Sequence, residues 1–521
     1  MKKPEFSFFF LFFVLLLLVN VIIVDIAYTT LMSLFSQITV SNSFLKTIAN
    51  VYSVIVATLV LFTSVIIILE RRDPAKTLAW LLILIFLPIL GFIFYLTVGR
   101  QFRKRRMTAK KKVLNNYIYP LDSTFADGKV EFPWMTKSKE RLINLILNNA
   151  EFPVTLHNDV AVLTDGEEIF AAFIEAMTAA KEHIHLETYI LRNDNIGGRI
   201  SELLKAKAKE GIKVRIIFDA LGSRALGPAY LSEMRAAGIQ IEPFFPVRLP
   251  FMQNRINYRN HRKILVVDGA VGFVGGINIG DEYLGRDPAI GYWRDNHLQI
   301  KGNAVYFLQR IFLQDWYFIT RESLENNFPC LFPVENYPGN RVVQITASGP
   351  DTQWETIMQV YYYAIATAQE SIYLASPYFI PNESILTALQ TAALSGVDVK
   401  ILLPAKSDHK IVGLAAMSYF EELMETGVEI YLYQQGFLHS KILMIDGLIS
   451  SVGSANMDQR SFKLNFEVNA LIYSEETTKR LERDFRNDLE RSEKMSLEAF
   501  KERPLTQRIL ESWTRLFSPL L

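Results

Sequence analysis

The motif NHRKILVVDG at residues 260–269 recurs as LHSKILMIDG at residues 438–447, and this repetition decides the fold. Each copy reads His-x-Lys, then four residues, then Asp. A small-residue turn ending in asparagine follows each copy, GGIN at 275–278 and GSAN at 453–456. A histidine nucleophile, a lysine for an anion and an asparagine donor suit phosphoryl transfer without a metal. Two copies in one chain predict two half-sites that face each other across one phosphate.

The duplication extends well beyond the motifs. In each copy, helical stretches such as 167–180 and 198–210 alternate with short β-branched runs that end near glycine. Strands that alternate with helices of this length are typical of α/β folds. We expect an α/β fold of two tandem sandwich repeats with pseudo-two-fold symmetry. The repeats span 113–302 and 341–476, and 303–340 is the expected linker.

The motif residues are the candidate catalytic groups: His261, Lys263 and Asp268, and His439, Lys441 and Asp446. Because side chains alternate along a strand, the histidine and lysine of each motif share one face. Each aspartate falls at an Asp-Gly hairpin turn, where it orients the turn or pairs with a base rather than meets substrate. Asn278 and Asn456 return on the next strand. With the two lysines, they are the expected phosphate ligands.

The chemistry expected from two histidines is a double displacement. One imidazole attacks phosphorus, and the other protonates the leaving group and then deprotonates the incoming alcohol. The two imidazoles must differ in protonation, which a nearby carboxylate can arrange. Asp295 and Glu467, each about 30 residues past the histidine of its own repeat, are the candidate orienting groups. The alternative is that both are ordinary surface carboxylates.

Composition narrows the class of protein. The chain has 521 residues and a net charge of +1, without the global basic field typical of nucleic-acid binders. One cysteine, Cys330, excludes an internal disulfide and a cysteine-based zinc cluster. With seven histidines, two of them in the motifs, a histidine-rich metal site is also disfavoured. We expect neither metal nor cofactor and no nucleic-acid partner.

Three apolar runs precede the repeats, at 6–24, 51–69 and 77–98. Each is about the 20 residues that a bilayer core requires, so residues 1–112 are expected to form a membrane anchor. A cleaved signal peptide is the alternative for the first run. That run is longer than the usual apolar region of 7–15 residues.

Charge asymmetry predicts the orientation. Basic residues flank the outer ends of the first two runs, which places both ends of this hairpin in the cytoplasm. A dense basic cluster at 100–112 follows the third run. A re-entrant third run, bent at Pro88 and Gly91, keeps that cluster inside beside anionic lipid, whereas three full spans would place it outside. We expect a multi-pass plasma-membrane protein with its catalytic body on the cytoplasmic face.

These motifs resemble those of the phospholipase D superfamily, and the similarity to the bacterial cardiolipin synthases runs from about residue 50 to the C-terminus. Four further segments carry this resemblance: RRDPAKTLAW at 71–80, INYRNHRK at 256–263, SGPD at 348–351 and SPYFIP at 376–381. The resemblance implies a metal-independent phosphatidyl transfer between two phosphatidylglycerol molecules, giving cardiolipin and glycerol through a phospho-histidine. By analogy it implies that His261 is the nucleophile and His439 the acid/base. Phosphatidylglycerol, cardiolipin and the membrane are thus the expected partners.

Alternatives remain within and outside this superfamily. Hydrolysis by water, or transfer to another alcohol such as serine, would use the same motifs, because the acceptor is selected by pocket shape. A nuclease of the same fold needs a basic groove with stacking aromatics and no anchor. A non-enzymatic membrane scaffold has no need of two intact motifs.

The C-terminal segment 477–521 is expected to be a helical tail. It carries an amphipathic pattern, with apolar Ile509, Trp513 and Leu516 opposite Arg508 and Arg515. Such a helix lies on a membrane surface or docks on the protein body.

Overall fold

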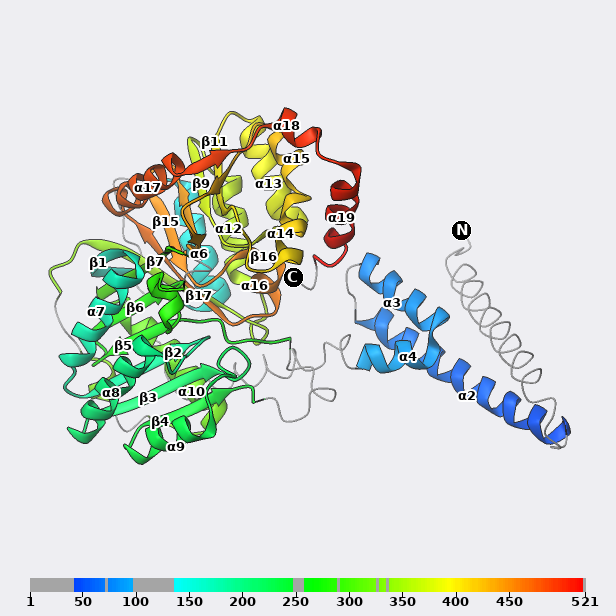
Figure 1. Cartoon of the computed structure of the whole chain (residues 1–521), viewed down its shortest axis with the longest axis horizontal. Helices are drawn as coiled ribbons and strands as arrows, with labels where there is room; N and C mark the ends of the chain where they lie inside the picture. Colours follow the sequence, from blue (N-terminus) through cyan, green and yellow to red (C-terminus); the bar gives the residue numbers. More distant parts are fainter. Residues whose placement is uncertain are drawn as a thin grey trace. The chain divides into compact units, whose positions relative to one another are not determined.

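The computed structural model describes residues 42–70, 74–96, 135–246, 257–287, 291–324, 328–333 and 337–518. The described residues form two compact units, an N-terminal helical unit and a large α/β body (Figure 1). The apolar run at 6–24 and the basic cluster at 100–112 lie outside the described residues.

The N-terminal unit consists of α2 (Asn42–Leu69), α3 (Pro74–Phe86) and α4 (Pro88–Phe94). The part of α2 from Asn50 to Leu69 has a mean hydropathy of 2.6 and is, by length and composition, able to cross a membrane. The third apolar run is divided, because α3 ends before Pro88 and that proline begins α4. The bend expected in this run is therefore present, with Gly91 packed closely against the backbone of Ile83.

The body is built on a 16-stranded sheet. Outward from the β1–β8 pair at its centre, the equivalent strands of the two repeats follow in the same order on each side. The first repeat supplies β1 (Thr155–Asp165), β2 (His183–Thr188), β3 (Lys213–Asp219), β4 (Gln240–Phe244), β5 (Ile264–Val267), β6 (Val271–Gly275) and β7 (Trp293–Gly302). The second supplies β8 (Arg341–Ser348), β9 (Ser371–Ala375), β11 (Asp398–Pro404), β12 (Glu429–Tyr433), β14 (Ile442–Ile445), β15 (Ile449–Gly453) and β17 (Glu467–Tyr473). The order runs β4-β3-β2-β5-β6-β7-β1 and then β8-β17-β15-β14-β9-β11-β12. Since β1 pairs with β8, the two repeats share one continuous sheet.

Helices cover the sheet in both repeats (Figure 1). They are α6 (Lys137–Ala150), α7 (Gly166–Thr178), α8 (Asn195–Lys209), α9 (Pro228–Ala236), α10 (Val305–Thr320), α11 (Phe328–Leu331), α12 (Thr356–Ala366), α13 (Glu383–Leu394), α14 (Lys410–Met417), α15 (Phe420–Met424), α16 (Gln459–Lys463), α17 (Glu475–Glu490), α18 (Leu497–Lys501) and α19 (Leu505–Arg515). The helices expected at 167–180 and 198–210 correspond to α7 and α8. Side chains of Asp165 and Asp194 cap their first turns, which fixes where they begin.

Two expected boundaries need correction. The stretch 303–340 is not a simple linker, because it contains α10, whose apolar side chains are buried against the sheet of the first repeat. The tail 477–521 is not purely helical either. Its β18 (Ser492–Lys494) pairs with β12 and extends the edge of the sheet.

The variable residue of the first His-x-Lys motif joins α10 to the sheet. Arg262 points away from the histidine face, and its guanidinium forms a fully buried ion pair with Asp315 of α10. Asp315→Ala would remove the carboxylate that is paired with this buried guanidinium and leave only the more weakly interacting Glu187 and Asp351 near it. We expect a loss of about 3–5 kcal/mol in unfolding free energy, read as a lower thermal midpoint. Asp315→Asn retains an acceptor and should lose less, whereas an unchanged midpoint in the alanine variant would contradict this role.

The two motif hairpins have the same backbone. Asp268 and Gly269 have φ of 55° and 64°, and Asp446 and Gly447 have φ of 52° and 62°. Two successive residues at positive φ match the turn that joins twisted antiparallel strands. The hairpins β5–β6 and β14–β15 are therefore equivalent, and each has its histidine three residues before the first strand.

Candidate active site

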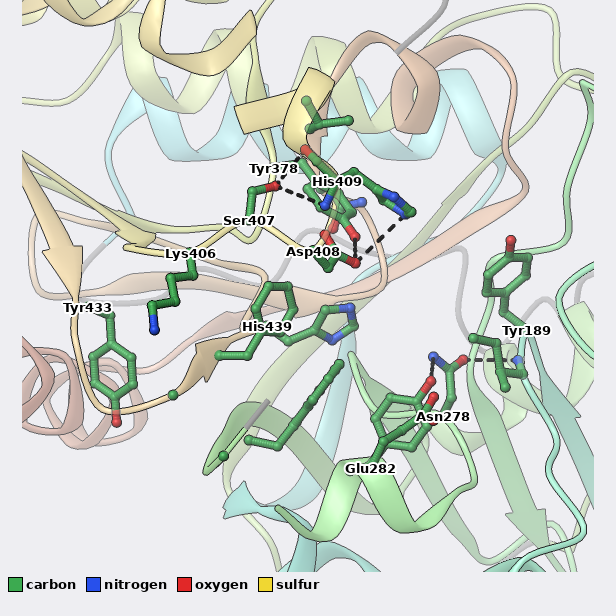
Figure 2. A pocket seen from close by; sticks show the side chains of 18 of the residues that line it. Tyr189, Asn278, Glu282, Tyr378, Lys406, Ser407, Asp408, His409, Tyr433 and His439 are labelled. Carbon is green, nitrogen blue, oxygen red and sulfur yellow. Dashed lines mark hydrogen bonds and ion pairs between the residues drawn. The ribbon is translucent and has the colours of Figure 1, made fainter. Parts of the chain in front are cut away.

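One cavity of about 1030 Å³ receives side chains from both motifs. His261 and His439 line it together with Asn278 and Asn456. Figure 2 shows His439 and Asn278 among the side chains around the cavity. Both histidines are more than nine-tenths buried. The sequence predicted two half-sites facing one phosphate, and the structure places both histidines on the same cavity.

Each histidine is held by a carboxylate from the other repeat. Nδ1 of His261 lies 3.0 Å and 3.1 Å from the two carboxylate oxygens of Glu467. Nδ1 of His439 lies 2.7 Å from Oδ2 of Asp295. The candidate carboxylates were identified by their distance from the histidine of their own repeat, but the structure pairs them crosswise.

The backbone makes the same exchange between repeats. The N–H of His261 donates to the carbonyl of Phe466 at 2.9 Å, and the N–H of His439 donates to that of Arg294 at 2.7 Å. The short strand β13 (Phe437–Leu438) pairs in parallel with the start of β7. Glu467 directly follows Phe466, and Asp295 directly follows Arg294. Each carboxylate is therefore next in sequence to the residue whose carbonyl oxygen accepts from its histidine.

The small residues of the two turns make room for these carboxylates in different ways. A Cβ atom at Gly276 would lie 2.1 Å from Oδ1 of Asp295, so only glycine fits there. The matching residue of the second repeat, Ser454, instead donates its hydroxyl to Glu467 at 2.5 Å. Asn465 also donates to Glu467, at 3.1 Å. Both carboxylates are therefore fixed before substrate binds.

Both carboxylates remain ionised. Burial alone would raise their pKa, but the neighbouring lysine and histidine outweigh burial and hold the pKa of Asp295 and Glu467 below the usual range. An ionised carboxylate at Nδ1 favours the tautomer with its proton on that nitrogen. Nε2 of each histidine is then the nitrogen available to a substrate.

Both histidines are neutral in the free site near pH 7. Burial lowers the pKa of His261 to about 4, although Glu467 opposes the effect. Burial and the charge of Lys441 lower the pKa of His439 to about 3. A neutral imidazole has the lone pair on Nε2 that a nucleophile requires.

The two lysines lie behind the histidines. Nζ of Lys263 donates to the carbonyl oxygen of His261 at 2.7 Å, and Nζ of Lys441 donates to that of His439 at 2.5 Å. Nζ of Lys441 also lies 2.8 Å from Nδ1 of its histidine. Burial lowers the pKa of Lys263 to about 7 and that of Lys441 to about 8. Both lysines are buried, and neither is among the residues that line the cavity.

The two asparagines differ in their contacts. Asn278 accepts from the N–H of Ile190 at 3.2 Å and donates to the hydroxyl of Tyr283 at 3.1 Å. Oδ1 of Asn456 is buried and has no hydrogen-bond partner among the described residues. Both side chains reach the cavity, where an amide can contact a phosphate oxygen.

The motif aspartates are corrected from catalytic to structural residues. Asp268 accepts from the backbone N–H groups of residues 181–183, each at 2.8 Å. Asp446 accepts from those of residues 369–371 at 2.8–3.1 Å. Neither aspartate lines the cavity. Each ties its hairpin turn to the start of the neighbouring strand, in agreement with the turn-orienting interpretation of the sequence.

The cavity also contains a polar cluster that the motifs did not reveal. The hydroxyl of Tyr378 donates to Asp408 at 2.7 Å, and His409 lies 3.8 Å from the same carboxylate (Figure 2). Ile190 occupies the position of Tyr378 in the first repeat. The cluster therefore breaks the symmetry of the cavity. Tyr378 belongs to the segment SPYFIP, but no sequence signal marked Asp408 or His409.

Comparisons with known proteins point to one family. A family model described as "Cardiolipin synthase, PLD-like domain" matches residues 173–316 and 361–489, and one described as "Phospholipase_D-nuclease N-terminal" matches residues 56–100. The chain is 48% identical to a cardiolipin synthase of Geobacillus sp. (strain WCH70) over 469 residues, covering 90% of this chain and 93% of that protein. It is 49% identical to the cardiolipin synthase of Geobacillus thermodenitrificans (strain NG80-2) over 475 residues, covering 91% and 94%.

A solved structure supports the fold. The crystal structure of phosphatidylserine synthase from Haemophilus influenzae Rd KW20 superposes with a TM-score of 0.57 at 15% identity. The match covers 74% of this chain and all of that one. At this identity the likeness concerns the arrangement of the two repeats and not the substrate.

Proposed function

We propose, for a chain that belongs to the cardiolipin synthases of phospholipase D type, that its two-histidine cavity transfers a phosphatidyl group from one phosphatidylglycerol to a second, giving cardiolipin and glycerol. The chain is thus a phosphatidyltransferase by family. One observation carries the mechanism. The two histidines share one cavity, and each is oriented by a carboxylate of the other repeat.

The first step forms a covalent intermediate. Nε2 of His261 attacks phosphorus of the donor lipid, and the bond from phosphorus to the glycerol oxygen breaks. His439 gives its Nε2 proton to that oxygen, so free glycerol leaves. His439 must be an imidazolium at this moment, and the nearby phosphodiester anion and Asp295 both favour its charge.

The second step reverses the roles. Neutral His439 takes the proton of the terminal hydroxyl of a second phosphatidylglycerol. The resulting oxygen attacks phosphorus, and the bond from phosphorus to His261 breaks. Cardiolipin is released, the empty site returns the proton of His439 to water, and binding of the next donor anion favours its protonation again.

The lysines and asparagines stabilise charge on phosphorus. Lys263 and Lys441 contribute their charge from behind the histidines, while Asn278 and Asn456 present amide groups to the cavity. Fixed donors and charges of this kind act most strongly in a site with little water.

We place this activity at a membrane. The family match and the apolar helix α2 mark a membrane-associated protein. Our proposal goes further, to a multi-pass plasma-membrane protein with two spans and one re-entrant element. In this arrangement the body faces the cytoplasm, where phosphatidylglycerol is available.

The direct test uses purified protein in detergent–lipid micelles, with phosphatidylglycerol as the sole lipid and a chelator present. Cardiolipin and free glycerol in equimolar amounts are expected. Phosphatidic acid with glycerol and no cardiolipin would make the protein a hydrolase. A product formed only when serine is added would indicate a different acceptor, and dependence on added metal would contradict the mechanism.

The lowered pKa values of the two lysines predict that activity falls as the pH becomes alkaline. Their pKa values of about 7 and about 8 mean that both ammonium groups lose their protons as pH rises through this range. The phosphodiester stays anionic throughout, so its stabilisation weakens. We expect kcat/KM to fall above about pH 7, where Lys263 begins to lose its proton, and to fall less in Lys263→Arg or Lys441→Arg variants that retain activity. A rate that stays flat to pH 10 would contradict charge stabilisation by these lysines.

A further inference from the structure

Helix α19 presents its apolar side to solvent and its polar side to the body. Glu511 is buried and accepts from Arg503 at 2.9 Å and from Gln507 at 3.0 Å. Arg515 donates to the carbonyl oxygen of Ser418 at 3.0 Å. The opposite side of α19 and of the turn that follows it carries large apolar side chains that are between 41% and 72% exposed: Leu505, Ile509, Leu510, Trp513, Leu516 and Phe517.

These six side chains form one continuous face. At 100° per residue they cover an arc of roughly 140°, interrupted only by Thr506. A helix on the surface of a soluble body normally buries such a stripe against the core. Here the bonds from Arg515 to Ser418 and Glu422 already attach the helix by its polar side, so the apolar face is left for a partner.

We propose that this apolar face docks on the surface of a lipid bilayer. The only acidic residue of α19 is the buried Glu511, so the exposed side carries no carboxylate. Arg508 is exposed and lies near one edge of the apolar arc, with only Ser512 between them. Trp513 lies within that arc. Apolar and aromatic side chains beside an exposed arginine are a pattern of helices that lie in the interface of an anionic membrane.

Helix α19 packs against α14, which reaches the catalytic cavity. Gln507 of α19 contacts the sulfur of Met417 in α14, at 3.9 Å. At the other end of α14, Ile411 is exposed, and Val412 lines the cavity. A bilayer on α19 would therefore lie beside α14, one helix away from the site. This link to substrate entry rests on the proposed function, whereas the docking itself does not.

The area argues against a second copy as the partner. An 11-residue helix is roughly 16 Å long and offers far less than the roughly 800 Å² per partner of a stable interface. A bilayer needs no matching surface. The second copy and the N-terminal helices of the same chain remain as outcomes of the test.

The test measures the surroundings of α19 in the full-length protein. In a Cys330→Ser background, a spin label is attached at Leu516→Cys on the apolar face or at Glu210→Cys, the control, at the exposed end of α8. The protein is reconstituted in bilayers of three parts phosphatidylcholine to one part phosphatidylglycerol. Collision with apolar oxygen and with a water-soluble nickel chelate is then recorded.

The label at 516 is expected to meet oxygen and to be shielded from nickel, while the label at 210 meets nickel freely. Equal access of nickel to both labels would overturn the proposal. Shielding from both reagents would also overturn it. Spin–spin broadening that is lost on dilution with unlabelled protein would then identify a second copy, and its absence would identify the chain's own N-terminal helices.

A matched activity measurement separates docking from chemistry. Ile509→Ser combined with Leu516→Ser should lower cardiolipin formation on vesicles roughly tenfold, because apolar area available to the membrane is lost. The rate in detergent micelles should be unchanged. Equal rates of variant and wild type on vesicles would contradict the link to substrate entry. If no cardiolipin forms with wild type, the proposed function fails, and the label measurement still decides the docking.

Discussion

His261→Ala is expected to lower cardiolipin formation by roughly 10⁴-fold or more, because it removes the proposed nucleophile, the atom that would form the covalent bond to phosphorus. The protein should still fold. His261 lies at the cavity and not in the hydrophobic core, and its motif neighbours Arg262 and Lys263 remain. A matched control is His157→Ala, which changes a histidine outside the cavity lining and should retain activity. Cardiolipin formation is measured as radiolabel transferred from phosphatidylglycerol.

His439→Ala should reduce the reaction with phosphatidylglycerol to a similar extent, but for a different reason. It removes the proton for the leaving alkoxide. A phosphatidyl ester of p-nitrophenol has a leaving group that needs no proton, so this variant should release one equivalent of p-nitrophenol and stop as the covalent intermediate. The His261→Ala variant should release none. If His261→Ala released one equivalent of p-nitrophenol and His439→Ala released none, His439 would be the nucleophile and His261 the acid/base.

The carboxylates give the second large effect. Glu467→Gln and Asp295→Asn keep the shape of the side chain but remove the charge that fixes the imidazole tautomer. We expect each to lower kcat by about 10²–10⁴-fold. Asp398→Asn, a carboxylate on β11 outside the cavity lining, is the control and should be close to wild type.

The crosswise pairing makes this second prediction specific. Glu467 lies in the second repeat but serves His261 of the first, so Glu467→Gln should slow release of p-nitrophenol from the activated substrate. Asp295→Asn should slow the reaction with phosphatidylglycerol and largely spare that release. If Asp295→Asn instead behaved like His261→Ala, and Glu467→Gln like His439→Ala, the crosswise assignment would be wrong.

Much of the fold was readable from the repeated motif. The apolar runs at 264–267 and 442–445 form strands, and the Asp-Gly pairs form hairpins, because local pattern and turn chemistry point to the same structure. Matching polar residues in both copies also predicted one shared cavity. The mirror order of the sheet is the consequence of duplicating one α/β unit and joining the copies at β1 and β8.

The partner of each histidine was not readable from the sequence. The contact from His439 to Asp295 spans 144 residues, and it depends on the pairing of β13 with β7 in the other repeat. A motif shows residue types at short spacing and carries no information about such a contact. The same applies to Asp408 and His409, which reach the cavity from the loop before α14.

Two segments were misjudged or left open for a related reason. Turn-forming residues near 326–339 suggested a linker, but the preceding apolar residues form the buried α10. In α19 the amphipathic pattern was plain, yet a pattern does not tell which side of a helix meets the body. Only the burial of Glu511 and the contacts of Arg515 with Ser418 and Glu422 show that the polar side is the attached one.

The central claim, that both repeats build one site with a single nucleophile, is tested most directly by trapping the intermediate. The His439→Ala variant would be mixed with the p-nitrophenyl phosphatidyl ester, quenched within the first turnover under conditions that preserve phospho-histidine, and analysed by intact-mass and peptide mass spectrometry. The account predicts one phosphatidyl group per chain, located on His261. A group on any other residue, or no covalent group while p-nitrophenol is released, would contradict it.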